Sequence, residues 1–181
     1  IQILVYTYYG ARQTASSRPC ADCAGMRRLK IRVPDVPAYM ATPKSCGANP
    51  TPIAFAEVYL ALQNGTVEAQ ENPLTTIEAK KFYEVQKHIM LTGHITESLV
   101  TIVSGGVWAK LPEADKKIVS EVMWEASTRA TNDIAEAFLS PEKFASTNQY
   151  SGFTGECSRI AAHTRSVAIV TIFCPAASPV V

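Results

Sequence analysis

Arg32 is a charged side chain inside an otherwise apolar, strand-like segment. Leu29-Lys-Ile-Arg-Val33 alternates with period two, which puts Arg32 and Lys30 on the face opposite the three aliphatic residues. A buried guanidinium needs an anionic partner, and its planar fork suits a carboxylate held by two parallel hydrogen bonds. The alternation leaves two interpretations open: Arg32 binds a ligand carboxylate, or it forms a structural ion pair with a nearby Asp or Glu.

Three other side chains could contact the same ligand. Asn72 lies in Gln70-Glu-Asn-Pro73, where the proline favours an extended backbone and leaves the amide available for hydrogen bonds, although such an Asn more often organises a turn. Phe55 could pack against a carbon skeleton, although its helical spacing with Val58 is more typical of a core residue. Arg12 could supply a second positive charge, or it could be a solvated surface residue.

A second candidate site involves cysteine. Cys20-Ala-Asp-Cys23 has the two-residue gap of a metal knuckle or a redox pair. A zinc site would need two more ligands, and the remaining candidates come with no second paired spacing: Cys46, Cys157 and His163. A small zinc- or thiol-dependent protein using Cys20 and Cys23 is therefore the alternative hypothesis. The five cysteines leave the redox compartment undecided.

Other functional classes find no support in the sequence. No histidine stands in an HExxH motif and no serine in a GxSxG motif, so we expect no enzymatic activity and no cofactor. A net charge of +1 provides no basic excess for a nucleic acid. The longest apolar run, residues 167–173, is shorter than the roughly 20 residues that cross a bilayer, so we expect no direct membrane insertion.

The elements that must position these residues alternate between strand and helix, which predicts an α/β fold. Strands are predicted over residues 1–6, 29–33, 89–92 and 99–103. Helices are predicted from Thr51 with Pro52 as first residue to about Asn64, from Thr75 to about Gln86, and from Leu111 to about Phe138. The last helix has a predicted apolar face that includes Ile118 and Val122. Because Ile1 begins a strand already under way, we expect the protein's true start to lie upstream.

Four runs resemble a known family in the same order. They are Leu29-Lys-Ile-Arg-Val-Pro34, Gly47-Ala-Asn-Pro-Thr-Pro-Ile-Ala-Phe-Ala-Glu-Val-Tyr59, Gln70-Glu-Asn-Pro73 and Lys81-Phe-Tyr-Glu-Val-Gln-Lys87. The family is that of the DctP-type solute-binding subunits of TRAP (tripartite ATP-independent periplasmic) transporters, and the resemblance covers about residues 1 to 135. It implies an α/β, periplasmic-binding-protein-like (type II) receptor whose two lobes close on a ligand, with a long helix spanning the lobes.

The resemblance also implies roles for the candidate residues. Arg32 occupies the arginine of the family's strand motif and would form the salt bridge to the ligand carboxylate. Arg12, Phe55 and Asn72 fall on positions similar to the family's secondary ligand contacts. No cofactor is implied.

The resemblance implies a division of the chain, as a fragment that lacks the N-terminal part of the first lobe. Residues 1–9 would be the end of a first-lobe or hinge strand, and residues 10–97 the second-lobe ligand-binding domain. Residues 98–139 would return to the first lobe as a strand and a long hinge helix. Residues 140–181 would be a divergent C-terminal segment.

The implied function is a periplasmic, extracytoplasmic receptor that binds a small organic carboxylate and delivers it to the membrane subunits of a TRAP transporter. Two departures stand against the family pattern. Residues 19–28 replace a polar, helix-forming segment, and Glu68-Ala69 stands where the family tends to have Asp-Gly. A truncated fragment without function stays open as a further alternative.

Overall fold

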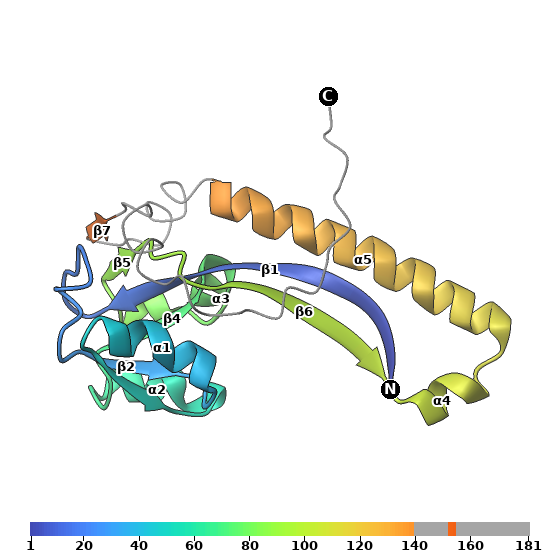
Figure 1. Cartoon of the computed structure of the whole chain (residues 1–181). Helices are drawn as coiled ribbons and strands as arrows, with labels where there is room; N and C mark the ends of the chain where they lie inside the picture. The colour runs from blue at the N-terminus through green and yellow to red at the C-terminus, as the bar shows by residue number, and fades with distance from the viewer. Residues whose placement is uncertain (140–151, 155–181) are drawn as a thin grey trace.

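The structure is a computed structural model, and it describes residues 1–139 and 152–154 of the chain. Within these residues the strands form one sheet (Figure 1). Its strands are β1 (Gln2–Ser16), β2 (Lys30–Val33), β3 (Asn49–Pro52), β4 (Ala69–Pro73), β5 (His88–Met90), β6 (Thr96–Val103) and β7 (Gly152–Thr154). Their order is β3-β2-β4-β1-β5-β7, and β6 pairs with β1 outside this row.

The long strand β1 belongs to two parts of the molecule. Up to Ala11 it pairs antiparallel with β6, and from Arg12 to Ser16 it pairs with β4 and β5. The first pairing forms an extended arm, and the second lies inside a compact body (Figure 1). Gly10 lies at the junction with φ +104, where the register with β6 shifts. A side chain at this φ would be strained, so glycine suits the irregularity.

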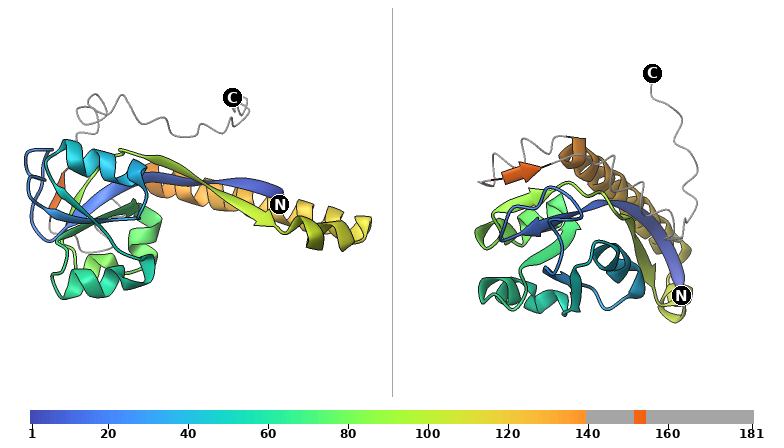
Figure 2. Two further views of the ribbon diagram at one scale, coloured as in Figure 1. Left: turned by 60° about the horizontal axis from the view of Figure 1, so that its bottom comes forward. Right: turned by 60° about the vertical axis from the view of Figure 1, so that its left-hand side comes forward.

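Helices flank the sheet and the arm. They are α1 (Pro37–Ser45), α2 (Val58–Gln63), α3 (Leu74–Ala79), α4 (Gly105–Lys110) and α5 (Glu113–Leu139), with 3-10 turns η1 (Phe55–Glu57) and η2 (Phe82–Glu84). Helix α5 runs along β1 in both views of Figure 2. Ser127 Oγ donates to Tyr6 O at 3.0 Å, and the Tyr8 N–H donates to Thr131 Oγ1 at 3.2 Å. Hydroxyl groups on the helix therefore satisfy part of the β1 backbone.

Each face of the sheet in the compact body has its own hydrophobic core. One core joins Ala15 and Ile89 of the strands to residues of α2, α3 and their neighbours: Val58, Ala61, Leu62, Val67, Leu74, Ile77 and Phe82. The other joins strand residues to the loop before β2 and the end of α1: Ile31, Val33, Ala69, Met90, Cys20, Met26, Leu29, Cys46 and Ala48. Because side chains alternate along a strand, Arg32 points to the α2/α3 side, opposite Ile31 and Val33. The period-two prediction for this segment is confirmed.

Two predicted helix boundaries are wrong. Thr51 and Pro52 do not start a helix but end β3, which pairs in parallel with β2. Prolines are tolerated there because β3 lies at the end of the strand row, where a missing N–H costs little. The helix predicted from Thr75 to Gln86 stops at Ala79, and Lys81 adopts a left-handed conformation with φ 54 before η2.

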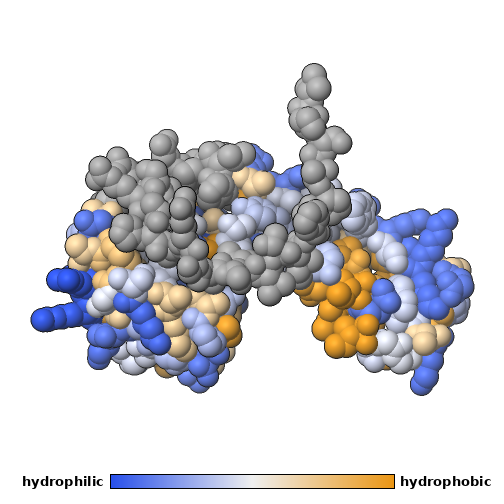
Figure 3. All heavy atoms as spheres, in the orientation of Figure 1, coloured by the Kyte–Doolittle hydropathy of each residue, from blue (hydrophilic) through white to orange (hydrophobic). Residues whose placement is uncertain are grey.

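The predicted strand at residues 1–6 is longer than expected, because β1 continues to Ser16. The predicted long helix is confirmed as α5, but its apolar face is only partly covered. Ile118 and Val122 are each 58% exposed. Apolar side chains of the arm are exposed too, and Figure 3 shows a hydrophobic surface over β6 and the start of β1. The exposed apolar residues of the arm include Ile1, Ile3, Leu99, Val100 and Ile102.

Candidate anion-binding site

Arg32 is buried in β2 with 3% of its surface exposed. Its Nε donates to Ile53 O at 2.9 Å, and its guanidinium carbon lies 5.7 Å from the centre of the Phe55 ring. Across residues 1–139 and 152–154, no carboxylate pairs with Arg32 and no hydrogen bond uses its two terminal nitrogens. Those nitrogens form the part of the guanidinium that would hold a carboxylate.

The pKa of Arg32 is lowered, chiefly by burial, with the charge of Glu71 opposing and that of Arg12 adding to the effect. Burial therefore disfavours the positive charge, and no ion pair with the described residues compensates for it. An anion bound at the terminal nitrogens would remove this imbalance.

Phe55 lies in η1 beside Arg32, and it is 43% exposed rather than part of the core. Its ring meets the Phe82 ring edge-on at 6.4 Å between centres. The Lys80 ammonium lies 5.6 Å from the ring centre. Phe55 thus offers an accessible apolar surface next to the guanidinium of Arg32.

Arg12 is neither solvated nor unpaired. It lies buried between two carboxylates: its Nε pairs with Glu71 Oε2, and its Nη1 donates to Glu97 Oε2 at 2.7 Å. Burial alone would lower the pKa of Arg12, but the hydrogen bonds and charges of Glu71 and Glu97 outweigh it and raise the pKa. Two carboxylates therefore already offset the charge of this arginine.

Further polar residues surround Arg12. His94 Nε2 lies 3.3 Å from Glu71 Oε2, and its Nδ1 forms a 2.7 Å hydrogen bond with Thr92 Oγ1. The Tyr39 hydroxyl donates to Glu97, and the guanidinium of Arg12 lies over the Tyr39 ring. Burial, together with the hydrogen bond to Glu97, raises the pKa of Tyr39 to about 12. This cluster joins α1, β1, β4 and β6.

Asn72 links the Arg12 cluster to the neighbourhood of Arg32. Arg12 Nη2 donates to Asn72 Oδ1 at 3.1 Å, and Asn72 Nδ2 donates to Gln70 Oε1 at 2.6 Å. Gln70 is the register partner of Arg32 across the parallel pair of β2 and β4. The four predicted residues are therefore brought into one region, with Arg32 and Phe55 in direct contact and Arg12 and Asn72 joined by a hydrogen bond.

Sequence reasoning missed several polar residues of this region. Gln70 and Glu71 lie in the same motif as Asn72, and the strand period places Gln70 on the same face as Asn72. That period was a usable signal for Gln70. Tyr39 and Glu97 carry no such signal, because only the folded chain brings them to Arg12.

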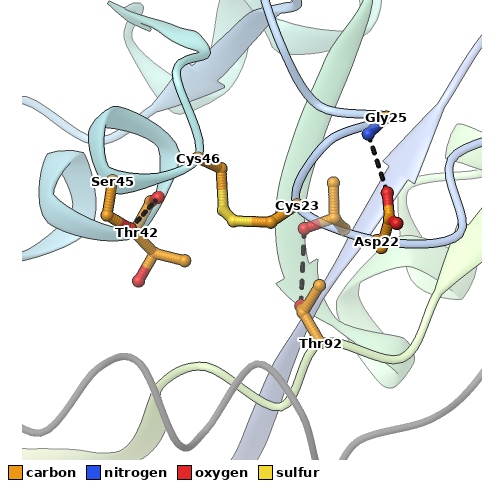
Figure 4. Close-up of a disulfide and its surroundings, with 8 residues drawn as sticks. Asp22, Cys23, Gly25, Thr42, Ser45, Cys46 and Thr92 are labelled. Carbon is orange, nitrogen blue, oxygen red and sulfur yellow. Dashed lines mark hydrogen bonds between the residues drawn. A yellow bond between two sulfur atoms is a disulfide. The ribbon is translucent and has the colours of Figure 1, made fainter.

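The cysteine pairing of the alternative hypothesis is wrong. Cys23 forms a disulfide with Cys46, not a site with Cys20, and it ties the loop before β2 to the end of α1 (Figure 4). A cysteine in a disulfide has no thiolate for zinc or for redox chemistry with Cys20. In the described part of the chain, no group of three metal-ligating side chains is present. Cys157 and His163 lie outside the described residues.

The described helices include none long and apolar enough to cross a bilayer.

The model of the family described as bacterial extracellular solute-binding protein, family 7 (DctP) matches residues 1–147. The chain is 42% identical over 127 residues to the sialic acid-binding periplasmic protein SiaP of Vibrio cholerae, covering 70% of this chain and 40% of that protein. It is 36% identical over 138 residues to the 2,3-diketo-L-gulonate-binding periplasmic protein YiaO of Escherichia coli, covering 75% of this chain and 42% of that protein.

Solved structures of TRAP periplasmic solute binding proteins also match this chain. A TRAP periplasmic solute binding protein from Polaromonas, bound to D-erythronate, matches with a TM-score of 0.79 and 33% identity, over 88% of this chain and 54% of that one. Another from Roseobacter denitrificans, with bound L-galactonate, matches with a TM-score of 0.78 and 30% identity, over 89% and 54%. The chain thus spans about half the length of these solved relatives.

Proposed function

This chain belongs to the bacterial extracellular solute-binding protein family 7, the DctP type, and on that premise we propose that it is part of a receptor that binds a small organic acid through Arg32. The observation that carries the proposal is the buried guanidinium of Arg32, whose terminal nitrogens meet no acceptor among the described residues. A ligand carboxylate would accept two hydrogen bonds there and offset the buried charge. Phe55 would pack against the ligand's carbon skeleton.

The proposal assigns different roles to the two arginines. Arg32 would contact the ligand, whereas Arg12, held by Glu71 and Glu97, would position Asn72 through their hydrogen bond. Asn72 would then lie at the edge of the site. No group in this arrangement is proposed to carry out a reaction, so the function is binding.

We also propose the setting of that binding. The receptor would act in the periplasm and deliver the acid to the membrane subunits of a TRAP transporter. Residues 10–97 would be the ligand-binding lobe, and residues 1–9 and 98–139 would connect it to a first lobe through the β1/β6 arm and α5. Residues 140–181 would be a divergent C-terminal segment. The support is the family match together with the separation of the compact body from the arm (Figure 1).

A thermal-shift screen tests the proposal. The 181-residue chain would be melted with each of five acids that relatives are named for or hold: sialic acid, 2,3-diketo-L-gulonate, D-erythronate, L-galactonate and succinate. An acid at a hundred times its dissociation constant stabilises the fold by about 2.7 kcal/mol, which a melting curve resolves. We expect at least one acid to raise the midpoint and Arg32→Ala to lose the response.

The matched control is Arg129→Ala. This variant removes the same charge from the exposed surface of α5, where Arg129 pairs with Glu125, and it should keep the full response. Loss of the response in both variants would point to net charge rather than to Arg32. If the folded chain binds none of the acids, the proposed function is contradicted for this chain.

A further inference from the structure

Gln70 carries a buried hydrogen-bond donor that the described part of the protein does not use. Its side chain is completely buried in β4, and its Nε2 meets no acceptor among the described residues. Buried amide groups are nearly always hydrogen-bonded, because an unmet donor keeps the full cost of leaving water. The second amide of the same region, Asn72, is bonded through both its oxygen and its nitrogen.

The hydrogen bonds that start at Arg12 determine which side-chain atom of Gln70 has no partner among the described residues. A guanidinium can only donate, so Asn72 must turn Oδ1 toward Arg12 Nη2, 3.1 Å away. Its Nδ2 then faces Gln70 and requires an acceptor, which is Oε1 at 2.6 Å. The only remaining polar atom of Gln70 is Nε2. The orientation of both amides thus follows from the salt bridges that hold Arg12 to Glu71 and Glu97.

The unused donor belongs to the same face as Arg32. Arg32 and Gln70 are register partners on the neighbouring parallel strands β2 and β4, and side chains at paired positions project from the same side of a sheet. Adjacent strands therefore present two sets of nearly buried donors without acceptors among the described residues: the terminal nitrogens of Arg32 and the Nε2 of Gln70. Both require an oxygen atom that accepts.

We propose that Gln70 is a second ligand-binding residue, which donates from Nε2 to an oxygen of the acid held by Arg32. This inference rests on the proposed function. It restricts the ligand's chemistry near the carboxylate: the group that meets Gln70 is an acceptor, such as the second carboxylate oxygen, a carbonyl or a hydroxyl. An ammonium group at that position is excluded, because Arg32 and Gln70 supply only donors there.

The experiment compares two buried glutamines. Gln70→Met keeps the side chain's length but removes the unused donor, together with the Oε1 that accepts from Asn72. Gln13→Met does the same to a buried glutamine whose two ends are already bonded, to Ala11 O and the Gly93 N–H. For the acid found in the screen, we expect Gln70→Met to weaken binding about tenfold by calorimetry, the effect of one lost hydrogen bond to a charged group. Gln13→Met should retain the affinity and lose stability instead.

A spectroscopic measurement separates ligand contact from a structural role. The side-chain amide signal of Gln70, assigned by its absence in Gln70→Met, should shift in a ¹H–¹⁵N spectrum when the acid is added, and the Gln13 amide signal should not. In Arg32→Ala, which we expect to bind no acid, neither signal should move.

Two outcomes overturn the inference in different ways. If an acid binds through Arg32 but Gln70→Met keeps its affinity and the Gln70 amide signal stays in place, Gln70 is structural and the proposed function stands. If no acid binds the wild-type chain, the proposed function fails, and the role of Gln70 fails with it.

Discussion

Arg12 and Arg32 are both nearly buried, yet the charges next to them differ. Arg12 has Glu71 and Glu97 within salt-bridge distance, whereas Arg32 has a backbone carbonyl and an aromatic ring. In a low-dielectric interior, a charge with two counter-charges holds its partners in place, and a charge with none attracts an anion. At the scale of single residues, this contrast supports the proposal that Arg12 is structural and that Arg32 binds the ligand.

Removing Arg12 should therefore damage the fold. Arg12→Met would leave the carboxylate of Glu71 buried without its partner, and we expect a loss of about 3 kcal/mol or more in the free energy of unfolding, measured with urea. Adding Glu71→Gln to that variant should recover part of the loss, because the unpaired charge is removed. Arg129→Met, on the exposed surface, serves as the control and should leave the unfolding free energy nearly unchanged. An Arg12→Met variant as stable as the wild type would contradict the role given to this cluster.

Part of this site could be predicted from the sequence. The alternation around Arg32 gave the correct face, because strand geometry acts over neighbouring residues. Whether Arg32 or Arg12 was the one with structural partners could not be predicted in this way. Glu71 and Glu97 lie 59 and 85 residues from Arg12, so only the sheet topology brings them together.

At the scale of elements, residues 19–28 are the segment that is expected from the sequence to depart from the family pattern. It holds no regular helix, and the disulfide from Cys23 to Cys46 fastens it to the end of α1, over a core that includes Cys20, Met26 and Leu29. Backbone hydrogen bonds within the segment, such as Met26 N–H to Cys23 O and Arg27 N–H to Ala24 O, add to this link.

We expect this disulfide to contribute to stability. It closes a loop with a sequence separation of 23 residues, for which the chain-entropy model gives about 3 kcal/mol. The double variant Cys23→Ser, Cys46→Ser should lose approximately that much in the free energy of unfolding, whereas Cys20→Ser should not change the disulfide. Mass spectrometry of a non-reduced digest would show the Cys23 and Cys46 peptides linked. A digest that links Cys20 to Cys23 instead would restore the redox-pair hypothesis.

The helices and strands that have a strong local sequence pattern could be predicted. The helix α5 and the strand β2 follow from long amphipathic and short alternating patterns. The strand β3 was mistaken for a helix start because Thr51-Pro52 is also a helix N-terminal signal. Its strand conformation comes from pairing with β2, which is a tertiary effect.

At the scale of the whole molecule, the compact body buries its apolar residues and the arm does not. Exposed apolar side chains of β1, β6 and α5 include Ile3, Leu99, Ile102, Ile118 and Trp124. Contiguous apolar surface of this kind promotes association. The exposed apolar surface of the arm is therefore the region where this chain would bind other copies of itself.

Light scattering tests this expectation. The apparent mass of the 181-residue chain should rise with its concentration, and Ile102→Lys should reduce that rise by placing a charge on the apolar surface. Thr96→Lys adds the same charge to an exposed polar position of β6 and should have little effect. Equal behaviour of both variants would mean that charge alone, and not the apolar surface, controls association.

The continuity of β1 has a mechanical consequence. Because one strand is hydrogen-bonded to β6 in the arm and to β4 and β5 in the body, a force on the arm is transmitted to the body through the β1 backbone. The arm is also joined to the body by the chain between β5 and β6 and by the packing of α5 on α3. At the junction lies Gly10, where the register with β6 shifts and a Cβ would lie 3.2 Å from Ile134 Cγ2. A residue with a side chain at this position would therefore strain the place where the arm meets the body.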